Sequence, residues 1–400
     1  MGLFGLPRSP RGSNATLDVS PATLPGGRSI AASLPTPRLD LDPSLAVARY
    51  EELAQALPGT GIRYAVKANP HPLLLALLAA AGCGFDAASP AEVQLALNAG
   101  AAADTLIHSN PIARRADLAE VYRMGVRLFV VDAHSELDKL ADVAPEAAVL
   151  IRLATTGEGS DWPLSRKYGC SADHAVDLLV RAAELGLDPA GVAFHVGSQQ
   201  RQPRAWDAPL KTAADVFARA RAAGLTPRII DLGGGFPAGH EGDHPDLTAY
   251  GTAIREALVR SFPDPDHRPQ TLAEPGRGIV GDAGVVVTSV VSVIDRGGVR
   301  WVYLDAGVFT GLVETLDEAI RYRLSTSADG GPTGPVVLAG PTCDSADVLY
   351  EKQPVHLPLA LAEGDEVRFH SAGAYTTCYS TVGFNGFEPM PTVVVTGDQT

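Results

Sequence analysis

The chain has 400 residues, of which 46% are hydrophobic and 20% charged, and its formal net charge is −14. This length exceeds one compact core, so we expect two domains or a barrel with an appendage. The acidic balance argues against nucleic acid as a partner, because phosphates require a basic face. It suits a cationic substrate, but an acidic surface kept for solubility alone is the commoner cause.

Two further features of the sequence indicate the cellular compartment of the protein. The four cysteines lie far apart without a CxxC pair, which predicts neither a metal site nor a disulfide framework and favours a reducing cytoplasm. The longest apolar run, PLLLALLAAAGCGF, is too short to span a bilayer, and no signal segment opens the chain. We therefore expect a cytoplasmic protein without a membrane partner.

In chain order, residues 1–30 are rich in Pro, Gly, Ser and Arg and predict a flexible arm. Residues 37–57 predict a short extended piece followed by an amphipathic helix. From residue 64, apolar runs alternate with helix-like segments. Eight strands are expected: YAVKAN, GFDAAS, TLIHSN, LFVVD, VLIRLA, VAFHVGS, IIDLGGG and TLAEPG. Their spacing leaves room for a crossover helix each time, which predicts a (β/α)8 TIM-type barrel.

After residue 278 the pattern changes to β-rich segments separated by turn residues, such as AGVVVTSVVSVI and PTVVVTG. We expect an α/β protein in which the barrel occupies residues 31–278 and an all-β domain occupies 279–400. The first extended piece could belong to either.

Function in such a barrel lies at the carboxyl ends of the strands. The expected strand ends carry polar residues in this order: Lys67, Asp86, His108, Asp132, Arg152, His195, Gly233–Gly235, Glu274 and Arg277. A lysine there more often extends to the solvent at the rim. The functional alternative is a partly desolvated amine, with a lowered pKa, that forms a Schiff base.

Two neighbouring motifs favour the functional alternative. The triple glycine in DLGGGFP lets backbone N–H groups approach an anion such as phosphate, although a tight loop alone would also need glycines. EPGRG adds an arginine that can bind a phosphate and a carboxylate that can hold a pyridine nitrogen protonated. Amine, phosphate cradle and carboxylate together meet the requirements of pyridoxal 5′-phosphate (PLP).

From about residue 33 to 390 the chain resembles the fold-type III PLP-dependent decarboxylases, the ornithine/lysine/diaminopimelate group. The motifs that carry the resemblance are YAVKANP, FDAASPAEV, FHVGSQ, DLGGGFP, EPGRG, GPTCDSADVL and GAYTTCYSTVGFNGF. It implies the alanine racemase-like fold, with Lys67 carrying PLP, Glu274 pairing with the ring nitrogen and His195 stacking on the ring. The remaining implied cofactor contacts are Asp86, Arg152, Ser198, Gly233, Gly234, Gly235, Gly276, Arg277 and Tyr375.

The resemblance also implies a homodimer with shared active sites, in which Cys343 and Asp344 come from the partner subunit. Cys343 would guide reprotonation after CO2 leaves, and Asp344 would meet a distal ammonium of the substrate. Eukaryotic ornithine enzymes carry a substrate-binding aspartate where this chain has Glu318. The extra methylene leaves selectivity between ornithine and lysine open, and a helix-surface acid is the alternative for this residue.

The leading expectation is decarboxylation of L-ornithine to putrescine and CO2, without a metal. Lysine, or a specialised diamino acid of a biosynthetic pathway, is the alternative substrate. Two other classes are a non-catalytic homologue that binds another protein and a racemase of the same barrel type. The presence of Lys67, Glu274, Arg277 and Cys343 argues against the non-catalytic class.

Overall fold

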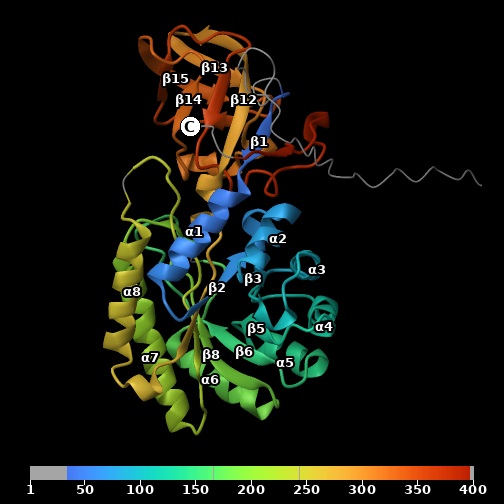
Figure 1. Ribbon diagram of the computed structural model, residues 1–400, viewed down its shortest axis with the longest axis vertical. Coiled ribbons are helices and arrows are strands. Elements are labelled where there is room, and N and C mark those ends of the chain that lie inside the picture. The colour runs from blue at the N-terminus through green and yellow to red at the C-terminus, as the bar shows by residue number, and fades with distance from the viewer. Residues whose placement is uncertain (1–33, 165, 243, 397–400) are drawn as a thin grey trace, which may run out of the picture.

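The computed structural model describes residues 34–164, 166–242 and 244–396. It has two lobes: a barrel ringed by helices and, above it in Figure 1, a lobe built mostly of strands. This confirms the predicted fold class. The predicted arm at residues 1–30 lies outside the described residues.

Eight parallel strands close the barrel in the order β10-β11-β2-β3-β4-β5-β6-β8. All eight expected strands are therefore present. Their bounds are β2 (Thr60–Ala65), β3 (Gly84–Ala87), β4 (Leu106–His108), β5 (Leu128–Val131), β6 (Ala148–Arg152), β8 (Asp188–Ala193), β10 (Ile229–Asp231) and β11 (Gln270–Ala273). A small buried cluster drawn from these strands fills the barrel interior: Ile107, Val130, Leu150, Ala190, Ala193 and Leu272.

Four of the helices that surround the barrel, α1, α3, α6 and α8, begin at conventional capping residues. The side chains of Asp42, Ser89, Ser171 and Asp246 each accept a hydrogen bond from the first turn of the helix that follows. The helices are α1 (Pro43–Ala56), α2 (Pro72–Ala80), α3 (Pro90–Asn98), α4 (Arg115–Arg123), α5 (His134–Val143), α6 (Ala172–Glu184), α7 (Asp207–Ala222), α8 (Leu247–Ser261) and the short α9 (Arg277–Val280).

One barrel strand is displaced from its expected position. The strand expected at YAVKAN starts four residues earlier, at Thr60, where it pairs with β11. It ends at Ala65, and Val66–Ala68 forms a 3₁₀ turn, η2. Lys67 therefore lies on the turn just beyond the strand, at the carboxyl end of the barrel.

The second lobe contains a nine-stranded sheet. Its strands are β1 (Arg38–Leu41), β12 (Gly284–Arg296), β13 (Val299–Leu304), β14 (Leu324–Thr326), β15 (Thr333–Ala339), β16 (Val348–Leu349), β17 (Val355–Pro358), β18 (Glu366–Phe369) and β19 (Thr392–Val394). The N-terminal strand β1 pairs with both β12 and β19. We propose that the domain boundary lies near residue 279, with β1 belonging to the β domain.

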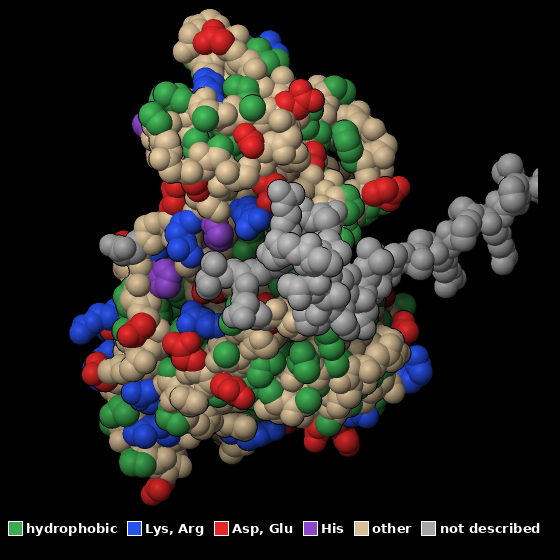
Figure 2. Space-filling model, turned by 45° about the horizontal axis from the view of Figure 1, so that its top comes forward, with side chains coloured by type: hydrophobic (Ala, Val, Ile, Leu, Met, Phe, Trp, Pro, Cys, Tyr) green, Lys and Arg blue, Asp and Glu red, His purple; other side chains and the backbone are tan. Residues whose placement is uncertain are grey.

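Two smaller features complete the fold. Strands β7 (Ser160–Trp162) and β9 (Ser198–Gln200) form a separate two-stranded sheet, which the sequence analysis did not predict. On the face shown in Figure 2, Lys, Arg and His side chains gather near the junction of the two lobes. Within the part of the chain that the structure describes, no helix is long and apolar enough to cross a membrane.

Candidate active site

Lys67 lies at the base of the expected site. Its Nζ is 2.5 Å from Oδ2 of Asp86, whose side chain on β3 is fully buried. The other Asp86 oxygen, Oδ1, accepts a hydrogen bond from the hydroxyl of Ser109. The turn of Lys67 is itself held by the β domain, because Tyr375 N donates to Ala68 O over 2.7 Å. The lysine, its counter-ion and the β domain thus meet at the mouth of the barrel.

The charge state of Lys67 differs from the expectation. Burial alone would lower the pKa of this amine, but the negative charge of Asp86, which also accepts its hydrogen bond, outweighs burial and raises the pKa. The predicted lowered pKa is therefore wrong for the protein without a bound cofactor. The side chain nevertheless keeps 46% of its surface accessible, so the amine can be reached.

His195 follows β8 and faces the glycine turn. Its Nδ1 accepts a hydrogen bond from Gly197 N over 3.0 Å, which places the proton of a neutral ring on Nε2. Burial, with a further contribution from the charges of Arg152 and Lys67, lowers the pKa of His195 to about 3. The ring therefore stays neutral at physiological pH. A neutral, oriented ring is suited to stacking on an aromatic cofactor.

The glycine turn follows β10 and is held on both sides. Gly233 N donates to Oδ1 of Asp231 over 2.8 Å, and Gly233 O accepts from Glu274 N over 2.8 Å. Gly233 has φ +67°, and a side chain there would meet the carbonyl oxygen of Phe194. A Cβ at Gly234 would lie 3.1 Å from His195 Nε2, so the glycine leaves space next to the imidazole.

Glu274 follows β11 and has a buried oxygen, Oε1, with no hydrogen-bond partner. Burial raises the pKa of Glu274 well above its usual range, and the nearby charges of Asp231 and Asp86 raise it further. Burial also raises the pKa of Asp231 to about 6. An unpaired buried carboxyl oxygen is costly, so its presence marks a place for a hydrogen-bonding group of a ligand.

Arg277 begins α9, next to Gly276. Its Nε is 3.3 Å from Ser198 Oγ, its Cζ lies 5.0 Å from the centre of the Tyr375 ring, and its Nη1 is buried without a partner. Gly276 provides close packing, since a Cβ there would lie 2.8 Å from that of Ala68 and 3.3 Å from the Tyr375 hydroxyl. These contacts join the expected phosphate-binding residues to the turn of Lys67.

The residues expected to hold PLP fit the cofactor. The unpaired oxygen of Glu274 suits a protonated ring nitrogen, and the unpaired Nη1 of Arg277 suits a phosphate oxygen.

Two further residues expected at the cofactor site are Arg152 and Tyr375. Arg152, at the end of β6, lies with its Cζ 5.2 Å from the centre of the Tyr168 ring. Tyr375 has a φ of +63°, a conformation that non-glycine residues adopt at a cost and that is common at functional sites.

Cys343 and Asp344 lie elsewhere, on an exposed loop of the β domain. Cys343 N and Sγ lie 3.2 and 3.5 Å from Oδ1 of Asn385, and Asp344 Oδ1 accepts from Ala346 N over 2.9 Å. Among the residues that the structure describes, no hydrogen bond or ion pair joins Cys343 or Asp344 to the barrel. Within one chain, neither residue is therefore bonded to Lys67 or Asp86.

Glu318 is fixed by contacts of its own. Its Oε2 is 3.0 Å from Arg321 Nη1, while Oε1 accepts from the backbone nitrogens of Lys352 and Gln353 over 2.5 and 3.2 Å. Both Asp317 and Glu318 have positive φ, +55° and +62°. The acid is therefore part of a strained, internally bonded segment rather than a free helix-surface residue.

Two residues in this region were missed by the sequence analysis. Glu314, on the 3₁₀ segment η8 (Val313–Glu318), forms a buried ion pair with Arg277. Asp347 is 2% exposed and accepts hydrogen bonds from Val308 N, Thr342 N and Thr342 Oγ1, which fixes the loop that carries Cys343. Asp347 belongs to the GPTCDSADVL motif, but its bond to Val308, 39 residues earlier in the chain, cannot be read from the motif.

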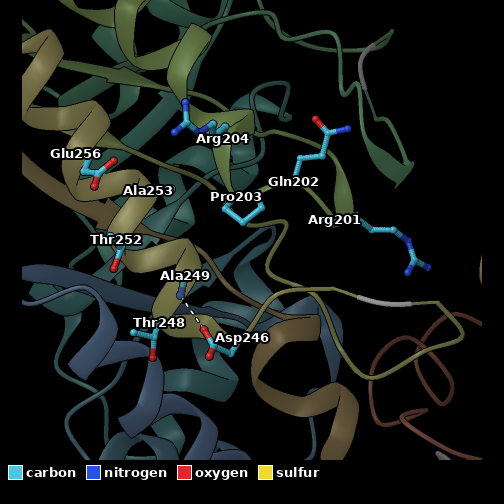
Figure 3. Close-up of a pocket in the computed structure, with 10 residues that line it drawn as sticks. All are labelled: Arg201, Gln202, Pro203, Arg204, Asp246, Thr248, Ala249, Thr252, Ala253 and Glu256. Atoms are coloured by element: carbon cyan, nitrogen blue, oxygen red, sulfur yellow. Dashed lines mark hydrogen bonds between the residues drawn. The ribbon is translucent and has the colours of Figure 1, made fainter.

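A surface groove lies apart from these residues. It has a volume of about 740 Å³ between the 3₁₀ helix η4 (Pro203–Trp206) and α8, and none of the expected site residues lines it (Figure 3). Asp246, which lines the groove, caps α8 by accepting a hydrogen bond from Ala249 N over 2.8 Å.

Comparison with known proteins agrees with this geometry. Residues 45–281 match the family model described as pyridoxal-dependent decarboxylase, pyridoxal binding domain. The lysine/ornithine decarboxylase of Selenomonas ruminantium is 34% identical over 368 residues, which cover 92% of this chain and 91% of that protein.

Two solved structures are also similar. The enzyme abbreviated SrLDC, in complex with PLP and cadaverine, is 34% identical with a TM-score of 0.82 and coverage of 91% and 92%. The Paramecium bursaria Chlorella virus arginine decarboxylase bound to agmatine is 28% identical with a TM-score of 0.84 and coverage of 92% and 98%. With the barrel, the lysine at its mouth and the matched pyridoxal-binding domain, the chain belongs to the pyridoxal-dependent decarboxylases, which act on basic amino acids with PLP as cofactor.

Proposed function

We propose that the protein decarboxylates L-ornithine to putrescine and CO2. The observation that carries the proposal is the grouping of Lys67, Asp86, Glu274 and Arg277 at the barrel mouth, with an acidic loop on the β domain to meet a second ammonium. When bound, PLP supplies an electron sink for the electrons left as the bond between Cα and the carboxylate breaks.

The barrel residues have distinct tasks in this proposal. Lys67 would attach PLP through its amine, and Asp86, which pairs with that amine, would hold its proton. Glu274 would hold the ring nitrogen and its proton through the unpaired Oε1, and neutral His195 would stack on the ring. Ser198, Arg277, Tyr375 and the turn of Gly233–Gly235 bind the phosphate. Arg152 and Asp86 line the ring site.

The second half of the site comes from another copy of the chain. Cys343 and Asp344 are exposed and make only local contacts within their own β domain. Large apolar side chains on the segment that leads to Asn385, the residue that contacts Cys343, are exposed too, with Tyr379 at 50% and Val382 at 81%. Burial of this face against a second copy would place Cys343 close to Cα, where its thiol can deliver a proton, and Asp344 at the distal ammonium.

Ornithine is preferred over lysine for a reason of size. Glu318 is one methylene longer than the aspartate that eukaryotic ornithine enzymes carry there, and its contacts with Arg321 and with the backbone of Lys352 fix the chain. A longer acid held in place shortens the pocket, which suits the shorter diamino acid. All four cysteines are free, and free thiols favour the cytoplasm as the place of this reaction.

The test is CO2 release by purified, PLP-loaded protein from L-ornithine, L-lysine, L-arginine and meso-diaminopimelate. A dominant signal from ornithine supports the proposal, and a dominant signal from another substrate replaces ornithine with that one. Silence on all four with bound cofactor would point to a specialised diamino acid. Release of CO2 from none of them, together with failure to bind PLP, would contradict the proposed site.

A further inference from the structure

A buried ion pair connects the β domain to the expected phosphate site. Nη2 of Arg277 lies 2.5 Å from Oε1 and 2.7 Å from Oε2 of Glu314. The two side chains are only 3% and 9% exposed. Glu314 lies on η8, 37 residues after the arginine, and reaches it from the other lobe. Because both groups lose their hydration when they form such a buried pair, the pair adds little net stability. Its main effect is to fix the orientation of the two side chains.

The remaining groups of Arg277 are restrained in the same way, with one exception. Nε lies 3.3 Å from Ser198 Oγ, and the guanidinium lies over the Tyr375 ring. Nη1 alone is buried without a partner. The residue after the glycine turn packs against α9, since a Cβ at Gly278, next to Arg277, would lie 2.6 Å from the Cβ of Phe236. One nitrogen of an otherwise restrained guanidinium, Nη1, therefore lacks a protein partner.

We propose that Glu314 is a positioning residue that holds Nη2 of Arg277 and thereby aims the free Nη1 at the phosphate of PLP. The inference rests on the proposed role of Arg277 in phosphate binding. Glu314 takes one nitrogen with both of its oxygens, so it does not occupy the donor that a phosphate would use. The ion pair has no net charge, so the phosphate is recognised by directed hydrogen bonds rather than by excess positive charge.

A competing role for Glu314 predicts the opposite result. If its carboxylate occupied Arg277 in place of phosphate, removing it would release the guanidinium and strengthen binding of PLP. If it positions Arg277, removing it lets the guanidinium rotate and weakens binding, even though the site gains positive charge. The direction of the change in PLP affinity therefore decides between the two roles.

The experiment compares PLP with pyridoxal, which lacks the phosphate, in titrations of the apo-protein monitored by absorbance of the lysine-bound cofactor. In Glu314→Ala we expect the Kd for PLP to rise roughly tenfold, the scale of a lost hydrogen bond to a charged group, with the Kd for pyridoxal unchanged. In Glu314→Gln, which keeps one acceptor oxygen, we expect a smaller rise of about threefold. Should Glu314→Ala fail to fold, Glu314→Gln decides the question in the same titrations.

Two controls separate the possible failures. Glu136 is 3% exposed and pairs with Lys139 over 2.7 Å on α5, so Glu136→Ala removes a comparable buried carboxylate and must leave the ratio of the two Kd values unchanged. Arg277→Ala must weaken PLP binding relative to pyridoxal. If it does not, the assignment of Arg277 to the phosphate is wrong. If it does, but both Glu314 variants bind PLP as tightly as the wild type or more tightly, the positioning role is wrong.

Discussion

The mouth of the barrel and the Cys343 loop of the β domain are bonded very differently. At the barrel mouth, charged side chains find partners inside the chain: Lys67 pairs with Asp86 and Arg277 pairs with Glu314. The exposed side chains of Cys343 and Asp344 reach only their own loop and Asn385. A buried charge without a partner is costly, whereas an exposed charge is stabilised by water. The charged groups of the barrel mouth are therefore paired within one chain, while those of the loop remain available to a second copy of the chain.

The largest expected effect is at the barrel mouth. Lys67→Ala removes the only amine that attaches the cofactor in this account, so we expect a loss of turnover of about a thousandfold or more and loss of the absorbance of lysine-bound PLP. Lys139→Ala, on α5, is the matched control and should keep both. Near-normal turnover in Lys67→Ala would mean that the site is elsewhere.

A smaller and different effect is expected at the loop. Asp344→Asn leaves the distal ammonium of the substrate without a charged partner, so KM for ornithine should rise by roughly 30-fold, corresponding to about 2 kcal/mol. The affinity for PLP should not change, because, in the part of the chain that the structure describes, no hydrogen bond or ion pair joins Asp344 to the residues expected to hold PLP. Steady-state kinetics and a PLP titration measure the two quantities. An unchanged KM would remove Asp344 from the substrate pocket.

Glu318 sharpens the comparison in terms of substrate length. Glu318→Ala widens the end of the proposed pocket. We expect kcat/KM to fall about tenfold more for ornithine than for lysine, because only ornithine loses a contact that fits its length. Competition between the two substrates in one reaction gives the ratio directly. Equal losses would reduce Glu318 to a structural role through Arg321.

The last prediction concerns stability rather than activity, and it tests the contact between the barrel and the β domain. His240 is 3% exposed, its Nε2 lies 3.0 Å from Ser371 O, and its ring packs edge-on against Tyr322. Burial, with the nearby charge of Arg277, lowers the pKa of His240 to about 3, from about 6.5 in the unfolded chain. Below pH 6.5 the unfolded chain therefore binds a proton that the folded protein does not, and stability falls as pH falls.

Relative to His240→Gln, the wild type should lose about 1.4 kcal/mol of unfolding free energy for each pH unit between roughly pH 6 and pH 4. The difference between the two proteins cancels the contribution of the other titrating groups. Denaturant unfolding at pH 7, 6 and 5 measures it. Parallel pH dependences would show that His240 titrates normally in the folded protein.

Local sequence predicted the barrel well because apolar strand runs, glycine turns and crossover spacing are local signals. All eight strands were found this way, and Lys67 and Glu274, which were expected as the last residues of strands, lie just beyond the ends of β2 and β11. Glu314 could not be found, since its importance depends on Arg277 reaching it from the other lobe. The raised pKa of Lys67 was missed for a related reason: it requires the distance to Asp86, which sequence spacing does not give.

The central claim, that each site joins the barrel mouth of one chain to the loop of another, can be tested by mixing two inactive variants. Lys67→Ala and Cys343→Ala each disable every site in their own homodimer, but a mixed dimer would contain one intact site. After dissociation and random reassociation, we expect about one quarter of the wild-type turnover, because half of the dimers are mixed and each carries one of two sites. No activity in a verified mixed dimer would contradict the shared site.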